Sequence, residues 1–133
     1  MTIRYMLDTN TVSYLVRGNE QVKKAVRAHP MSDLCISSIT EAELLYGIMR
    51  RPEATKIEKL IREFLRLVQS LPWGEEEALQ FAIARAALEK NGKTLESMDM
   101  LIAAHALSVD AVLITNDKVF SYVDGLQLEN WTV

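Results

Sequence analysis

Short apolar segments alternate with helical patterns along the whole chain, and this alternation limits the possible folds more than any other feature. We expect five strands, at residues 3–7, 34–36, 67–71, 111–114 and 126–128. We expect six helices, at residues 10–17, 20–28, 37–51, 53–66, 75–90 and 97–107. Strands that alternate with helices form a mostly parallel sheet with helices on both faces. The predicted fold class is therefore α/β.

Length and composition narrow the class of protein. A chain of 133 residues without a linker, repeat or low-complexity tract predicts one domain over residues 1–133. The hydrophobic fraction of 49% and the charged fraction of 25% exclude a disordered chain. The net charge of −3 excludes a uniformly basic nucleic-acid-binding surface, although a local basic patch is compatible with it.

The surroundings of the protein are also constrained. The single cysteine, Cys35, cannot form an internal disulfide, which favours a reducing, cytoplasmic location. The first residues do not have the pattern of a signal peptide. The longest apolar stretch, residues 100–107, is far shorter than the ~20 residues that cross a bilayer, so we expect no membrane association.

Four acidic residues lie where ligands of such folds bind. Asp8 follows the first predicted strand directly, and Asp117 follows the fourth after two residues. Glu43 and Asp99 lie near the beginnings of the helices at 37–51 and 97–107. Open α/β sheets bind ligands beyond the carboxyl ends of their strands. If the first and fourth strands are neighbours, these four acids can converge at that edge of the sheet.

Each acid also has a purely structural interpretation. Asp8 fits the N-cap of the following helix, and Asp117 fits an ordinary turn. Asp99 fits a first-turn acid that interacts favourably with the helix dipole, with Ser97 as the cap. Taken together the structural interpretations are weaker, because clustered carboxylates repel one another and normally require a cation. Carboxylate oxygens without Cys or His favour Mg²⁺ or Mn²⁺.

Glu43 has a competitor two residues earlier. Both Thr40-x-x-Glu43 and Ser38-x-x-Glu41 match a capping box. Helical geometry alone does not choose between Glu41 and Glu43 as the acid of the site.

Other chemistries have little support in the sequence. His105 does not share a helix face with Asp99, and His29 lies in a loop next to Pro30. Cys35 lies inside an apolar strand, which predicts an inert thiol. No glycine-rich phosphate-binding loop occurs, so a nucleotide-triphosphate enzyme is disfavoured.

Four segments of the chain match motifs of a known family in the family's own order. They are YMLDTN at 5–10, CISSITEAELLYG at 35–47, SMDMLIAAHA at 97–106, and ITNDKVF at 114–120 followed by Gly125-Leu126 and Glu129-Asn130-Trp131. On these motifs the chain resembles PIN-domain ribonucleases, and among them the VapC toxins of toxin–antitoxin systems. One departure is Glu96-Ser97, where family members often have Gly-Pro-like residues before the third acid.

The resemblance implies a PIN-like domain, for which we expect strand order 3-2-1-4-5. It implies an endoribonuclease dependent on Mg²⁺ or Mn²⁺, with Asp8, Glu43, Asp99 and Asp117 holding the ions. Thr115 and Asn116 are expected to position Asp117, a bound water or a phosphate. The implied substrate is structured RNA, either tRNA or rRNA, and similar enteric proteins cut initiator tRNA in the anticodon loop. A VapB-like antitoxin and a homodimer are the implied partners.

Three alternatives have less support. A PIN-like binding module without activity is disfavoured because all four acids are present. A receiver domain requires paired acids after the first strand, whereas Asp8 has no acidic neighbour. A haloacid-dehalogenase-like phosphatase requires a second Asp at position 10, where this chain has Asn10.

Overall fold

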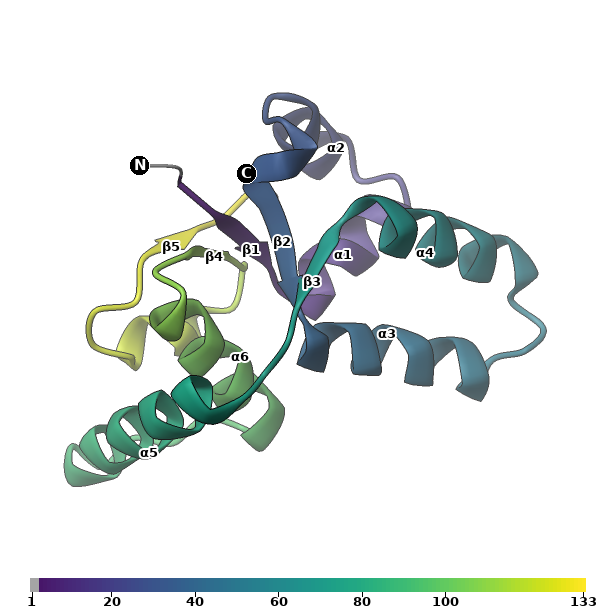
Figure 1. Cartoon of the computed structure of the whole chain (residues 1–133). Coiled ribbons are helices and arrows are strands. Elements are labelled where there is room, and N and C mark those ends of the chain that lie inside the picture. Colours follow the sequence, from purple (N-terminus) through teal and green to yellow (C-terminus); the bar gives the residue numbers. More distant parts are fainter. Residues whose placement is uncertain (1–2) are drawn as a thin grey trace.

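The computed structural model of the chain describes residues 3–133 (Figure 1). Its centre is a five-stranded sheet in the order β3-β2-β1-β4-β5, and every neighbouring pair of strands is parallel. The strands are β1 Tyr5–Leu7, β2 Leu34–Ser37, β3 Gln69–Leu71, β4 Val112–Ile114 and β5 Leu128–Glu129. The predicted fold class and strand order are confirmed, and the first and fourth strands are neighbours.

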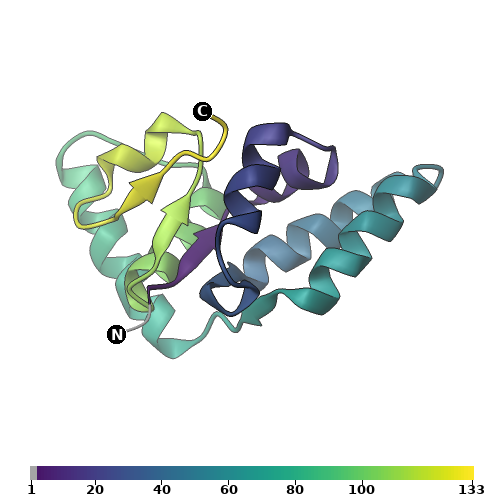
Figure 2. The ribbon, with the colours of Figure 1, turned by 90° about the horizontal axis from the view of Figure 1, so that it is seen from above.

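The strands alternate with helices, as the sequence pattern predicts. The α-helices are α1 Thr9–Val16, α2 Glu20–Arg27, α3 Ser38–Arg50, α4 Thr55–Leu67, α5 Glu75–Lys90 and α6 Ser97–Ser108. Figures 1 and 2 show α1 to α4 on one side of the sheet and α5 and α6 on the other. In both views α3 and α4 run side by side and extend beyond the sheet.

The central strands are buried on both faces, so successive side chains supply two separate cores. Leu7 of β1 faces a core formed with α1 to α4, whereas Met6 faces a core formed with α5 and α6. In β4, Ile114 and Leu113 divide in the same way. This two-residue period follows from the pleat of a strand. Burial on both faces also explains why these strands are continuous apolar runs rather than alternating ones.

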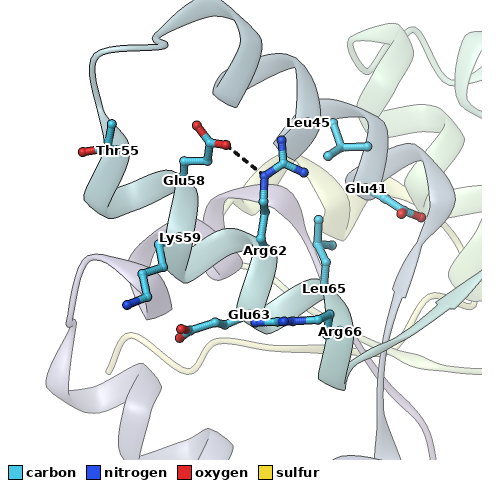
Figure 3. A pocket seen from close by; sticks show the side chains of 9 residues that line it. All are labelled: Glu41, Leu45, Thr55, Glu58, Lys59, Arg62, Glu63, Leu65 and Arg66. Atoms are coloured by element: carbon cyan, nitrogen blue, oxygen red, sulfur yellow. Dashed lines mark hydrogen bonds and ion pairs between the residues drawn. The ribbon is translucent and has the colours of Figure 1, made fainter.

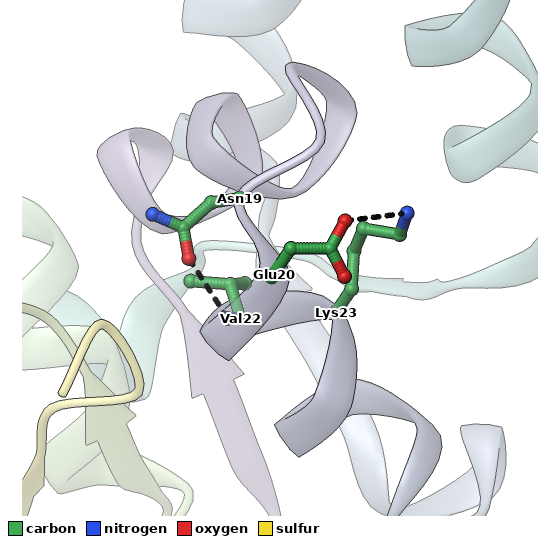
Figure 4. Close-up of polar contacts among 4 residues, drawn as sticks. All are labelled: Asn19, Glu20, Val22 and Lys23. Carbon is green, nitrogen blue, oxygen red and sulfur yellow. Dashed lines mark hydrogen bonds and ion pairs between the residues drawn. The ribbon is translucent and has the colours of Figure 1, made fainter.

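Helix α2 illustrates how short polar contacts define a boundary. Gly18, at φ 88°, ends the preceding helix in a conformation that favours glycine. The Asn19 side chain then accepts a hydrogen bond from the Val22 amide at 3.0 Å and caps α2 (Figure 4). Lys23 lies 3.5 Å from Glu20 on the exposed side, while Val22 is fully buried beneath them.

Several predicted boundaries are wrong by one to two residues. Helix α4 begins at Thr55 rather than at 53, because residues 52–54 form the turn out of α3. Strand β3 begins at Gln69 rather than at 67, because Leu67 completes α4. Two short 3₁₀ helices, Met31–Asp33 and Lys118–Tyr122, have no periodicity that would reveal them in the sequence.

Candidate active site

Asp8 lies immediately after β1 and is only 4% exposed. It is the N-cap of α1, and its Oδ1 accepts a hydrogen bond from the Thr11 amide at 2.8 Å. Burial raises the pKa of Asp8, the Thr115 and Thr11 side chains oppose the rise, and the nearby charge of Asp117 adds to it. Asp8 therefore does cap α1, as its structural interpretation predicts. Capping alone does not explain why its buried carboxyl group lies near another acid, Asp117.

Glu43 reaches the same place from α3. The Thr9 hydroxyl donates a 2.5 Å hydrogen bond to Oε1 of Glu43. Thr9 directly follows Asp8, so this bond draws the Glu43 carboxylate to the carboxyl end of β1. Nothing in the local sequence pattern reveals this role of Thr9, because its partner lies 34 residues away in the chain.

The side chain of Glu41 is directed toward β3 rather than toward the acidic cluster. Its Oε1 accepts a 2.7 Å hydrogen bond from the Ser70 hydroxyl of β3. The side chain lines a surface hollow between α3 and α4 (Figure 3). The structure therefore separates the two glutamates, which helical geometry had left equivalent.

Neither predicted capping box forms. The N-cap of α3 is Ser37, whose side chain accepts from the Ile39 amide at 3.1 Å. Ser38 accepts instead from the Trp73 amide at 3.1 Å, and the buried Thr40 hydroxyl has no partner within residues 3–133. The boxes fail because the N-cap, Ser37, lies one residue before the first of the two predicted caps, Ser38. The predicted Ser97 cap of α6 is also wrong, since Glu96 occupies the N-cap position and makes no side-chain cap bond.

Asp99 lies half-buried in the first turn of α6. Burial, followed by the charges of four other acids in the order Glu96, Asp117, Glu43 and Asp8, raises its pKa to about 6. The other three predicted acids are thus within electrostatic reach of the Asp99 carboxyl group. Glu96, the residue that departs from the family pattern, acts on Asp99 as well.

The turn after β4 carries the remaining predicted residues. The buried Thr115 accepts a 3.1 Å hydrogen bond from the Asp117 amide through its hydroxyl. Asp117 is exposed, and its Oδ1 accepts from the Val119 amide at 3.0 Å. The Asn116 side chain donates to the Tyr14 hydroxyl of α1 at 3.2 Å. Thr115 thus contacts the backbone of Asp117, whereas Asn116 joins the turn to α1.

The cluster has the donor chemistry of a divalent-metal site. Carboxylate oxygens are the ligands that Mg²⁺ and Mn²⁺ prefer. None of the ion pairs within residues 3–133 includes any of the four acids, so their charge is not balanced by a Lys or Arg of the described chain. As the side chains stand, no group of three His, Cys, Asp or Glu in that range is arranged to hold one ion. The residues fit a divalent ion in charge and in donor chemistry, and joint ligation of one ion requires their side chains to come closer together.

The other titratable candidates lie in the core. His105 is fully buried, its Nδ1 lies 2.7 Å from the Ser37 hydroxyl, and burial lowers its pKa. Cys35 is buried, and burial raises the pKa of its thiol to about 11, as expected of an inert thiol. Neither residue is among the charges that act on Asp99.

Comparison with known proteins gives one consistent result. The family model for the PIN domain matches residues 5–126. Ribonuclease VapC2 of Haemophilus influenzae is 34% identical over 130 residues, which cover 97% of this chain and 98% of the relative. The tRNA(fMet)-specific endonuclease VapC of Salmonella typhimurium is 29% identical over 131 residues, which cover 97% and 98%.

Solved structures agree with the sequence relatives. The structure of DNA-bound VapBC from Salmonella typhimurium superposes with a TM-score of 0.90 at 29% identity, covering 97% of this chain and 98% of that one. FitAcB from Neisseria gonorrhoeae superposes with a TM-score of 0.86 at 29% identity, covering 96% and 97%.

The fold and the family match define the class as a PIN-domain protein. The chain belongs to the VapC ribonuclease toxins of toxin–antitoxin systems within that family. Over residues 3–133, no helix has the length and apolar character needed to span a membrane.

Proposed function

We propose that this chain is a metal-dependent endoribonuclease that hydrolyses phosphodiester bonds in structured RNA and thereby inhibits translation. The observation that carries the proposal is the convergence of Asp8, Glu43 and Asp117, from three separate segments, on Asp99 of a fourth. Such a concentration of acids destabilises the folded chain through repulsion unless a ligand neutralises it, and a cation is the ligand that binds such a cluster.

The four acids have distinct positions in this proposal. Asp8, Glu43, Asp99 and Asp117 would hold Mg²⁺, with Mn²⁺ as a substitute. When bound, a divalent ion lowers the pKa of a water and stabilises charge on the leaving oxygen. Asp8 is held in place by the Thr11 amide, and Glu43 is oriented by the Thr9 hydroxyl. Thr115 fixes the backbone of the turn that presents Asp117.

The first experiment tests metal dependence. We expect chelation to stop RNA cleavage and added Mg²⁺ or Mn²⁺ to restore it. Ion binding should also raise Tm by mass action if the ion binds only the folded state. Asp8→Asn should abolish cleavage with the fold retained, whereas Asp124→Asn, at an exposed turn residue, should cut normally. Cleavage that survives exhaustive chelation contradicts the metal requirement, and RNA binding without cleavage by the wild type indicates an inactive binding module.

The proposed substrate is the anticodon loop of initiator tRNA. Its support is the name of the Salmonella relative, at 29% identity, and of a Shigella flexneri relative at 28% identity, both called tRNA(fMet)-specific endonucleases. The test is to incubate the chain with initiator tRNA, an elongator tRNA and ribosomal RNA, and to map the cut ends. Preferential cutting of either of the other two RNAs moves the assignment to another substrate.

A VapB-like antitoxin and a homodimer complete the proposal. Structures of VapBC and FitAcB, to which this chain is similar, support the antitoxin partner. On α5, the exposed apolar side chains of Leu79 and Ile83 lie one turn apart and offer a surface for a second copy. A cytoplasmic site of action follows from an RNA substrate engaged in translation. Light scattering of the chain alone and with the product of the neighbouring reading frame tests both partners.

A further inference from the structure

A groove leads away from the acidic cluster along the outer helices. It begins at Thr9 and Glu43, is about 310 Å³ in volume, and runs between α1, α3 and α4 toward the turn after α3. Its floor includes the buried side chains of Leu44, Ile48 and Ile61. We name this feature the α3 groove. Any RNA strand cut at the acids has to leave the cluster, and the α3 groove offers one continuous path.

Gly47 lines the α3 groove, and the protein itself gives no reason for a glycine there. It lies inside α3, where glycine destabilises a helix relative to alanine. Its φ is not positive, unlike those of Gly18, Gly92 and Gly125. A Cβ added at Gly47 would meet no heavy atom within 4 Å, so no close packing requires its absence.

The position of Gly47 points to a ligand outside the chain. It follows Glu43 by four residues, so both lie on the same face of α3, one turn apart. Glycine permits close approach of a ligand to the backbone. A strand whose phosphodiester lies at the acids and continues along the α3 groove therefore passes directly over Gly47.

The charges along the α3 groove favour a polyanion. Arg17, Arg50 and Arg51 line it, and no ion pair among residues 3–133 involves any of them. The acid farther along the groove, Glu58, already binds Arg62 at 2.9 Å. Guanidinium groups bind phosphates through paired hydrogen bonds. In a chain of net charge −3, three arginines that form no ion pair within residues 3–133 give this groove a local basic surface.

The neighbouring hollow between α3 and α4 differs from the α3 groove in its charges and in its relation to the acidic cluster. It is larger, at about 720 Å³, but it mixes Lys59, Arg62 and Arg66 with acids of the same two helices (Figure 3). None of the four candidate site acids lines it. This hollow therefore serves as the internal control for the α3 groove.

We infer that the α3 groove carries the RNA backbone away from the acidic cluster, with Gly47 as a clearance position and Arg17, Arg50 and Arg51 as phosphate ligands. The inference rests on the proposed ribonuclease function and adds the path of the substrate.

The test uses Gly47→Ala, Gly47→Leu and the single Arg→Gln variants at positions 17, 50 and 51. Gln21→Leu on the exposed side of α2 and Arg66→Gln in the neighbouring hollow are the matched controls. The readouts are Tm, KM and kcat for RNA cleavage, and RNA affinity measured in the Asp8→Asn background. Binding to the Asp8→Asn protein reports on the groove even if no cleavage is found.

We expect Gly47→Ala to raise Tm by about 2–5 °C, because alanine favours the helix and meets no atom. The same variant should raise KM about threefold, and Gly47→Leu at least tenfold, with little change in kcat. Each arginine variant should weaken RNA binding and flatten the slope of log Kd against log[salt] by roughly 0.7–0.9. If Gly47 were required only for the fold, its replacement by alanine would not raise Tm and weaken substrate binding at the same time.

Two results overturn the inference. One is that KM and RNA affinity are unchanged in Gly47→Ala and in the three arginine variants. This result overturns the inference even if Gly47→Leu fails to fold. The other is that these variants release the antitoxin while RNA binding is unaffected, which assigns the α3 groove to the protein partner. Wild-type binding that depends on Gly47 and the arginines, without cleavage, contradicts the proposed function and leaves the inference standing.

Discussion

Asp99 and Glu43 reach the acidic cluster from two helices with opposite surroundings. Helix α6 is buried almost all round, including every residue from Ile102 to Ala106. Helix α3 buries only Thr40, Leu44 and Ile48, and its Tyr46 and Met49 are 64% and 68% exposed. Packing therefore fixes the acid of α6, whereas the acid of α3 depends on a single side-chain hydrogen bond.

Within residues 3–133, hydrogen bonds near the sheet link the two helices. The Ser37 hydroxyl lies 2.7 Å from Nδ1 of His105, which joins the beginning of α3 to α6. Trp73 makes a second link, because its amide donates to the Ser38 hydroxyl and its Nε1 donates to the Leu101 carbonyl. The cluster therefore has a rigid side, set by α6, and an adaptable side, set by α3 and facing the α3 groove.

The largest effect is expected on the rigid side. Asp99→Asn should lower the cleavage rate by more than the roughly 100-fold loss typical of residues that only support metal ligands. Without metal, the variant should melt at a higher temperature than the wild type, because burial and four other acids disfavour the Asp99 charge. Rate and Tm are measured on the same preparation. A fully active variant removes Asp99 from the site.

On the adaptable side, the comparison is between the two glutamates of α3. Glu43→Gln should be nearly inactive with a near-normal Tm, because its carboxylate reaches the cluster and its contribution to packing is small. Glu41→Gln should cut normally, since the glutamine carbonyl can still accept from Ser70 and the loss is at most about 1 kcal/mol. The measurement is the cleavage rate and thermal midpoint of both variants side by side. An inactive Glu41→Gln with an active Glu43→Gln reverses the assignment.

Much of this comparison was predictable from the sequence. The continuous apolar strands and the parallel α/β class follow from the alternation of short apolar runs with helical patterns, whereas the strand order came from the family resemblance. The candidate acids were found from their positions after strands and near helix beginnings. Helical geometry could not choose Glu43 over Glu41, and only the family resemblance did, because the contacts that separate the two involve Thr9 and Ser70, which are distant in the chain. The capping boxes were wrong because local sequence fits several helix starts, and the contacts of Ser38 with Trp73 and of Ser37 with His105 are tertiary.

The rigid side also predicts a pH dependence of metal-free stability. The pKa of Asp99 rises from its ordinary 3.8 to about 6 in the folded chain. Between these values the folded chain binds a proton that the unfolded chain has released, so stability falls as pH rises from about 4 to 6. Asp99→Asn lacks this contribution, and its free energy of unfolding should fall less over the same range. Urea titrations at several pH values in a chelator measure the difference, and parallel curves for the two proteins contradict it.

The smallest effect is expected at Thr9, the residue that orients Glu43. Thr9→Val removes the hydroxyl that donates to Glu43 and keeps a β-branched side chain of similar size. Because the carboxylate remains and only its orientation is lost, the cleavage rate should fall about tenfold, the size of one lost hydrogen bond to a charged group. Thr9→Ser keeps the donor and should retain most of the activity. The required metal concentration should rise in Thr9→Val and not in Thr9→Ser, which a packing defect at the beginning of α1 would not produce. Equal rates and equal metal requirements in the two variants would show that Glu43 is positioned without Thr9, and the adaptable side would then be as rigid as α6.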